Sequence, residues 1–154
     1  MQKLTLSFLN CKSPIPIVRF PLSDGKSTCA IIDTGSETSV YDSSTKDCYP
    51  ELITKTKHFG KQEYIGVYET MEMDVNLSVL KLNVLRDNGE EVEFKIAAYE
   101  HQTFHLIGEK LQGREELSDN ILLLIGSDTL SYYNARIDMK NKCITFYIKK
   151  KRSQ

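Results

Sequence analysis

The sequence predicts one mostly β domain with a short helix near its carboxyl-terminal end. Stretches that alternate polar and apolar residues recur along the chain, beginning with KLTLSFL at residues 3–9. Such alternation is the pattern of a half-buried strand. Turn sequences separate these stretches, among them Ser23 to Lys26 and the Asn88-Gly89 pair, where glycine tolerates a positive φ. Many short strands joined by such turns favour a small barrel or sandwich.

Three further strands are expected before residue 43. Residues 16–22, PIVRFPL, contain prolines that place this strand near an edge or a bend. Residues 27–33, STCAIID, are almost continuously apolar, which predicts burial on both faces of the strand. Residues 38–42, TSVYD, resume the strand pattern after a Thr-Gly-Ser break.

The remaining signals are weak at residues 43–63 and extended again at residues 64–85. Ser127 stands where its side chain would cap a short helix. In chain order we expect a hairpin at 86–100, a charged surface connection at 108–120, a fully buried strand at 121–126, that short helix at 127–135, and a closing hairpin at 135–150 that turns at 140–142.

Length, composition and charge favour a soluble globular protein. The chain has 154 residues, of which 40% are hydrophobic and 27% charged, which suits one domain. We expect that domain at residues 1–148, followed by a basic, frayed tail at 149–154. The formal net charge of −1 offers no broad attraction for nucleic acid or an anionic membrane. We therefore interpret the KKKR run at 149–152 as a solvated chain end rather than a nucleic-acid patch or nuclear signal.

The cysteine pattern and the hydropathy of the chain point to the same class of protein. The four cysteines form no C-x-x-C pair and no Cys/His cluster with zinc spacing, so we expect no metal and no cofactor. No stretch approaches the length of a membrane span. We read the thiols as reduced and expect an intracellular, cytoplasmic protein.

Asp33 is the main candidate for a functional residue, because it ends an apolar strand. Residues 29–42, CAIIDTGSETSVYD, run an apolar strand directly into this aspartate, and an acid at the end of a buried strand costs free energy unless it is used. One interpretation is an Asx-turn or helix-capping residue. The other is a catalytic acid on a rigid loop. The chain has no second D-T-G or D-S-G, so a two-fold dimer would supply the other acid of a proton-sharing pair.

Two stretches, in the expected order, resemble the retropepsin family, the dimeric aspartic proteases of retroviruses and retrotransposons. The first is IVRFPLSDGKSTCAIIDTGSETSVYD at residues 17–42. The second is ILLLIGSDTL at 121–130, followed by ARIDMKNKCITFY at 135–147. The form LLLIGSDTL is most similar to gypsy-type and Bel/Pao-type element proteases and their domesticated relatives. The resemblance implies a closed, barrel-like β fold with one short carboxyl-terminal helix.

The resemblance also implies a role for each residue of the two signatures. Asp33 would be the catalytic carboxylate, one per subunit. Thr34 would bond to its counterpart across the dimer, and Gly35 would approach the substrate backbone. Ser36 would bond the outer carboxylate oxygen. Gly126 would pack beneath the active loop, where a side chain would not fit.

Other positions depart from the family pattern or are located only approximately. Glu37 stands where viral members often carry Asp, and Ser127 stands where they often carry Arg. Family members close a hairpin flap over the substrate, and here it must lie between about Ile53 and Val75. Gly60 and Gly66 are the candidate tips, and both glycines, like Glu37, are candidate substrate contacts.

Two functions follow from these observations. The first is an aspartic endopeptidase that acts as a homodimer on a peptide or protein. The second is a catalytically inactive, domesticated domain that serves for dimerisation or for binding a peptide or protein. The absence of a glycine-rich flap tip and the altered positions 37 and 127 motivate the second function.

Overall fold

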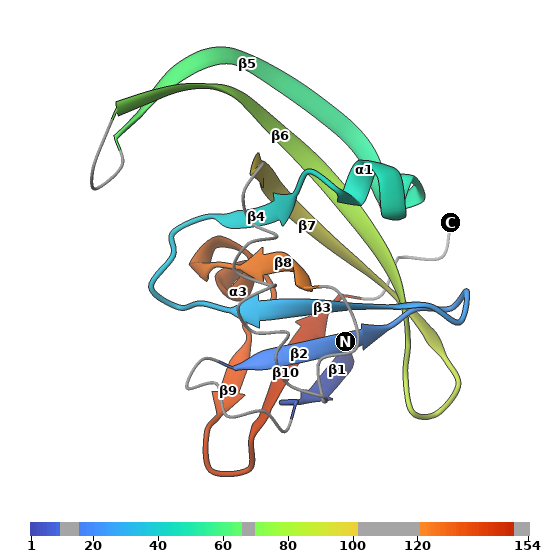
Figure 1. Ribbon diagram of the computed structural model, residues 1–154. Coiled ribbons are helices and arrows are strands. Elements are labelled where there is room, and N and C mark those ends of the chain that lie inside the picture. Colours follow the sequence, from blue (N-terminus) through green and yellow to red (C-terminus); the bar gives the residue numbers. More distant parts are fainter. Residues whose placement is uncertain (10–15, 66–69, 102–120, 150–154) are drawn as a thin grey trace.

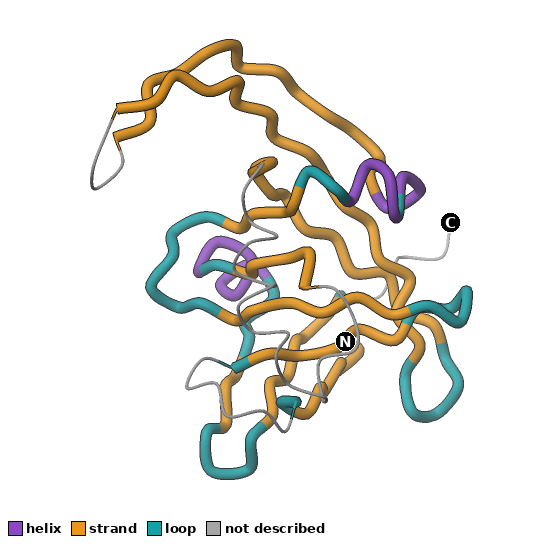
Figure 2. Tube along the Cα trace, viewed as in Figure 1, coloured by secondary structure: helices purple, strands orange, loops and turns teal. Residues whose placement is uncertain are grey.

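The computed structural model describes residues 1–9, 16–65, 70–101 and 121–149 (Figure 1). Strands dominate it (Figure 2), which confirms the mostly β class. The strands are β1 (Gln2–Ser7), β2 (Ile17–Pro21), β3 (Ser27–Ile32), β4 (Ser39–Asp42), β5 (Ile53–Ile65), β6 (Thr70–Leu85), β7 (Glu91–His101), β8 (Ile121–Ile125), β9 (Arg136–Asp138) and β10 (Cys143–Ile148). The helices are α1 (Thr45–Cys48), the 3-10 turn η1 (Pro50–Leu52) and α3 (Ser127–Tyr132).

Seven strands form one mixed sheet in the order β2-β3-β8-β4-β7-β6-β5. The β3–β8 and β4–β7 pairs are parallel, and the other pairs are antiparallel. A bridge between Leu22 and Val84 joins the end of β2 to β6. The sheet therefore curves back until its first strand meets its sixth, which gives the fold a barrel-like form. The proline-flanked β2 lies at one edge of the sheet, as expected.

The other three strands form a small sheet in the order β1-β10-β9. Strand β1 pairs with β10 along its whole length, from Gln2 opposite Ile148 to Ser7 opposite Cys143. A bridge between Phe8 and Val18 links the end of β1 to β2. The closing hairpin expected at 135–150 is present as β9 and β10.

An aromatic cluster joins the two sheets and α3 in the core. The ring of Phe94 on β7 lies 4.4 Å from that of Tyr133, 4.8 Å from that of Phe146 and 5.2 Å from that of Phe20, measured between centroids. All four side chains are buried. The Phe94–Tyr133 pair is stacked and the other two are tilted or edge-on. Aromatic pairs in such arrangements are favourable beyond their buried area, so this cluster fixes β2, β7 and β10 around one core.

The predicted turns are confirmed, and the predicted helix cap is wrong. Gly25 and Gly89 have φ of 87° and 83° in the two expected turns, where a residue with a Cβ would be strained. Helix α3 begins at Ser127 itself, and its cap is Gly126, which makes no side-chain hydrogen bond. The Ser127 backbone N–H donates to the Ser36 carbonyl at 2.7 Å. The helix therefore begins at Ser127, whereas a Ser127 cap would require it to begin at the next residue.

Strands β5 and β6 form the long hairpin that the resemblance located between about Ile53 and Val75. Their pairing runs from Ile53 opposite Leu80 to Ile65 opposite Thr70, with an irregularity between His58 and Lys61. Gly60 lies in that irregularity with φ of 76°, inside β5 rather than at its end. Gly60 is therefore not the tip of the hairpin, because the extra residue is absorbed as a bulge.

Some predictions fall outside the described residues. Gly66, the whole charged connection at 108–120 and the tail beyond Lys149 belong to this group. Helix α1 and η1 were missed, since residues 43–63 carry few periodic signals. Within the described ranges, none of the helices combines the length and the apolar character that crossing a membrane requires.

Candidate active site

Asp33 follows β3 at the point where two parallel strands end side by side. In the β3–β8 pair, Ile32 lies opposite Ile125. The Asp33 backbone N–H donates to the Ile125 carbonyl at 2.9 Å, so β8 holds the backbone of the aspartate. The residue after Ile125 is Gly126, and the two sequence signatures thus meet at one edge of the sheet. The Asp33 side chain is half-buried and Thr34 is exposed.

The loop after Asp33 folds back on the carboxylate. The Ser36 N–H donates to the Asp33 carbonyl at 3.2 Å, and the Gly35 N–H donates to Asp33 Oδ1 at 3.0 Å. The second bond is an Asx-turn interaction, so that interpretation of Asp33 is correct in part. No helix starts at this loop, so Asp33 is not a helix cap. Among the described residues, none donates a hydrogen bond to Asp33 Oδ2, which leaves one carboxylate oxygen for another ligand.

Gly126 lies directly under this loop. A Cβ at Gly126 would sit 2.3 Å from the Thr38 carbonyl oxygen and 2.8 Å from the Ser36 carbonyl oxygen. Both contacts are with backbone, which cannot move aside as a flexible side chain can. The loop and the start of α3 therefore pack backbone against backbone.

Ser39 connects the loop to α3, and it was not identified as a site residue from the sequence. Its Oγ accepts a hydrogen bond from the Gly126 N–H at 3.0 Å and donates one to Asp128 Oδ1 at 2.8 Å. The same Oγ lies 2.8 Å from Thr129 Oγ1, and the Ser39 N–H donates to Asp128 Oδ2 at 3.3 Å. Ser39 is fully buried. A serine at an inward-facing strand position was the available signal, because a buried hydroxyl needs partners.

Ser36 differs from its implied role. Its hydroxyl donates to the Thr38 carbonyl at 2.8 Å, and not to the Asp33 carboxylate. A serine hydroxyl has one proton to donate, and the local turn commits it to a carbonyl two residues on, which is a common short-range bond for serine. Glu37 is exposed beside it. The roles implied for Thr34, Gly35 and Glu37 involve a partner chain or a substrate and stay predictions.

The hairpin and the Asp33 loop project from the same side of the molecule. In Figure 1 the β5–β6 hairpin reaches beyond the body toward the left, the side on which the β3–β4 loop also lies. Strand β6 continues from this hairpin into the sheet, where it pairs with β7. The hairpin is therefore an arm built on the same sheet that positions Asp33.

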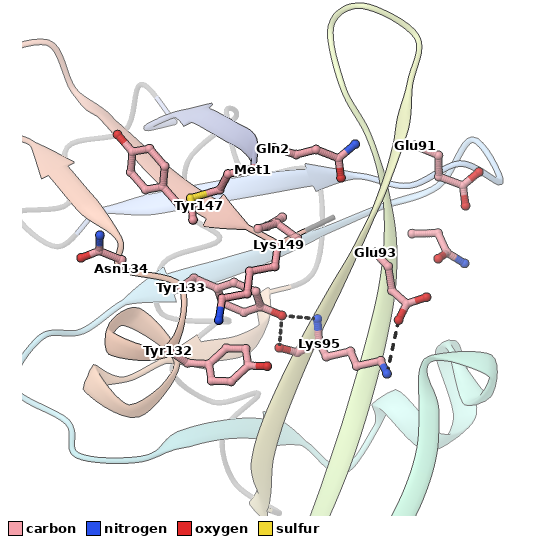
Figure 3. A pocket seen from close by; sticks show the side chains of 12 residues that line it. Met1, Gln2, Glu91, Glu93, Lys95, Tyr132, Tyr133, Asn134, Tyr147 and Lys149 are labelled. Carbon is pink, nitrogen blue, oxygen red and sulfur yellow. Dashed lines mark hydrogen bonds and ion pairs between the residues drawn. The ribbon is translucent and has the colours of Figure 1, made fainter. Parts of the chain in front are cut away.

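A pocket of about 740 Å³ lies elsewhere, and Figure 3 shows it from close by. Its lining comes from β1, β6, β7, β10 and the end of α3, and includes Tyr132, Tyr133 and Tyr147. The Tyr133 hydroxyl accepts a hydrogen bond from the Lys95 backbone N–H at 2.8 Å and donates one to the Lys95 carbonyl at 2.9 Å. Residues 33–38 do not contribute to this pocket, so it is separate from the candidate active site.

Comparison with solved structures finds proteins whose folds are similar to that of this chain. No protein-family profile and no curated protein matches it. The chain is similar to the retroviral protease-like domain of Ddi1 from Leishmania major, with 17% identity, a TM-score of 0.43, and coverage of 93% of this chain and 89% of that one. It is also similar to a retropepsin-like aspartic protease from Rickettsia conorii, with 14% identity, a TM-score of 0.43, and coverage of 95% and 91%.

Proposed function

We propose that this protein is a retropepsin-like aspartic endopeptidase that acts as a homodimer. The observation that carries the proposal is the presentation of Asp33. Its backbone is bonded to β8, its Oδ1 is bonded to Gly35, and its Oδ2 accepts no hydrogen bond from the described residues. The loop that bears it rests on Gly126 and is joined through Ser39 to α3. A rigid loop that presents one carboxylate oxygen suits a group that must meet a reacting atom.

The chemistry requires a second carboxylate, which another copy of the loop would supply. Asp128, the acid in the first turn of α3, is committed to the Ser39 hydroxyl and N–H. Two Asp33 side chains placed together by a two-fold axis would share a proton, because both cannot ionise at close range. The ionised member takes a proton from water as the oxygen attacks the scissile carbonyl carbon. The protonated member gives its proton to the carbonyl oxygen. As the C–N bond breaks, the first member passes the proton it took from water to the leaving nitrogen, and the second member recovers its proton from the hydroxyl group formed on the carbonyl oxygen.

The test is cleavage of a peptide library by the parent protein and by Asp33→Asn across acidic to neutral pH. Asn keeps the turn acceptor and removes the acid, so we expect cleavage to fall at least about 100-fold. Asp24→Asn is a matched control, since Asp24 Oδ1 also accepts the N–H two residues on, at 2.9 Å from Lys26 N. The control should cleave like the parent. Equal cleavage by Asp33→Asn and the parent would overturn the proposed mechanism.

A binding module without catalysis is the second candidate. The observation that favours it is the Ser36 hydroxyl, which bonds Thr38 instead of the Asp33 carboxylate. A well-folded dimer that cleaves no peptide, but binds one stoichiometrically and equally well as Asp33→Asn, would support this function. An origin from a gypsy-type or Bel/Pao-type element is a further proposal that rests on the LLLIGSDTL stretch.

A further inference from the structure

Tyr41 is a fully buried side chain in the strand that follows the Asp33 loop, and its hydroxyl has polar partners in the core. The hydroxyl oxygen lies 2.7 Å from Ser78 Oγ on β6 and donates to Glu100 Oε2 at 3.3 Å. Ser78 Oγ in turn lies 2.9 Å from Thr56 Oγ1 on β5. We call Thr56, Ser78 and Tyr41 the hydroxyl chain.

The register of the sheet explains how Tyr41 reaches the hairpin. Strand β7 separates β4 from β6, and Ala98 on β7 lies opposite both Ser39 of β4 and Ser78 of β6. Residues two apart on a strand share a face, so Tyr41, Ala98 and Ser78 point to the same side. Ala98 is fully buried and carries only a methyl group. The tyrosine ring can therefore pass over β7 to the hairpin.

The proton donors of the hydroxyl chain can be arranged in one consistent direction. Each hydroxyl has one proton, so Thr56 can donate to Ser78, Ser78 to Tyr41, and Tyr41 to Glu100. The Glu100 carboxylate also forms an ion pair with Lys46 of α1. Burial is the largest cause that raises the pKa of the Tyr41 hydroxyl, which keeps that proton in place. The Tyr41 and Ser78 hydroxyls are buried, and the chain of three ends on a carboxylate. Each hydroxyl therefore has a partner, and such satisfied networks favour one arrangement of the elements they join.

We propose that Tyr41 is a positioning residue that sets the angle of the β5–β6 hairpin relative to the Asp33 loop. This inference rests on the proposed function to the extent that the hairpin covers a bound peptide. The face of the hairpin that carries Thr56 and Ser78 continues outward to His58 and Asn76, which lie opposite each other in the register. Fixing the base of the hairpin through Tyr41 therefore also fixes the direction of that outer pair.

Amide hydrogen exchange of Tyr41→Phe tests the structural part of the proposal without any substrate. Loss of one buried hydroxyl should speed exchange of the amides that pair β5 with β6 near Thr56 and Ser78 by about tenfold. Amides of β10 should exchange as in the parent. Tyr133→Phe is the matched control, because it removes another buried tyrosine hydroxyl, one bonded to the Lys95 backbone. The control should leave the hairpin amides unchanged.

A kinetic measurement tests the positioning part. If cleavage is found in the parent, Tyr41→Phe should raise KM several-fold with kcat nearly unchanged, since it alters the hairpin and leaves Asp33 intact. Tyr133→Phe should change neither constant. Should the parent cleave nothing, the proposed function fails, but the exchange result still decides whether Tyr41 positions the hairpin. The two failures are thus distinguishable.

Thr56→Val is a second variant in case Tyr41→Phe does not fold. Thr56 is exposed, and valine keeps its shape while removing the end of the hydroxyl chain. It should speed exchange in the same hairpin amides. Faster exchange spread evenly over the chain, unchanged hairpin exchange in a folded Tyr41→Phe or Thr56→Val, or an equal effect of Tyr133→Phe on the hairpin would overturn the inference.

Discussion

Gly126 shows how one residue without a side chain determines the geometry of the candidate site. Its backbone lies against the Ser36 and Thr38 carbonyls, its N–H donates to the Ser39 hydroxyl, and the next N–H donates to the Ser36 carbonyl. These contacts bring the two sequence signatures together around Asp33. A glycine here is therefore a steric requirement rather than a need for an unusual backbone angle.

Gly126→Ala should destabilise the protein by about 3 kcal/mol, at the upper end of the usual cost of overpacking. The added Cβ would meet backbone atoms at 2.3 to 2.8 Å. Gly35→Ala is the control in the same loop, because its Cβ would meet only the movable Asp33 Oδ1, at 3.3 Å. Urea unfolding measures both losses. If the two variants lost the same stability, the close packing at Gly126 would not be the cause.

At the scale of elements, the turn of the β9–β10 hairpin is stabilised by hydrogen bonds to the charged carboxylate of Asp138. Asp138 Oδ1 accepts the Asn141 N–H at 3.0 Å, and Asp138 Oδ2 accepts the Asn141 side-chain amide at 2.7 Å. These hydrogen bonds favour the charged carboxylate and lower the pKa of Asp138. The turn is therefore a place where folding stability depends on protonation.

The pH dependence of this turn has a definite sign. Because the folded pKa of Asp138 lies below its unfolded value, the stabilisation is fully present above the unfolded pKa and is lost as the pH falls through the folded pKa. Asn141→Ala removes the side-chain donor, so the parent should melt above the variant at neutral pH. The difference in Tm between them should shrink as the solution is acidified below the usual aspartate pKa. A difference that is constant over this range would contradict the prediction.

At the scale of the whole molecule, one chain supplies one Asp33 loop, and the proposed chemistry needs two. If each copy is stably folded only within the dimer, Tm depends on protein concentration. A tenfold dilution costs about 1.4 kcal/mol per mole of dimer, which for protomers of this size lowers Tm by about 2 °C. Scanning calorimetry over a hundredfold concentration range measures this shift. Asp33→Asn should show the same shift, because it keeps the loop and removes only the acid.

Dilution also separates the proposed assembly from a monomeric enzyme. Below the dimer dissociation constant, cleavage should fall more steeply than in proportion to protein. Strict proportionality throughout, together with a Tm that does not change on dilution, would mean that a single chain is the active unit. The proposal that two Asp33 carboxylates from different chains share a proton would then be wrong.

Local pattern was enough to predict most elements of this fold. The alternation in β1, the apolar runs of β3 and β8, and the turns at Gly25 and Gly89 are present because their causes lie within a few residues of one another. The position of Asp33 at the end of a buried strand could also be expected from this pattern, whereas the close packing at Gly126 was implied only by the family resemblance. The Ser127 cap was wrong because the helix start depends on the Ser36 carbonyl, about ninety residues away in the chain.

By itself, the sequence determined most of the strands outside residues 43–63, the turns, and the two signatures at Asp33 and Gly126, since period-two hydropathy and glycine placement act locally. The tertiary structure alone decided what those signatures contact. It assigned the Ser36 hydroxyl to Thr38, made Ser39 the link to Asp128, placed Gly60 in a bulge, and carried Tyr41 over Ala98 to Ser78. Each of these depends on strand order and register, which bring together residues that are distant along the chain.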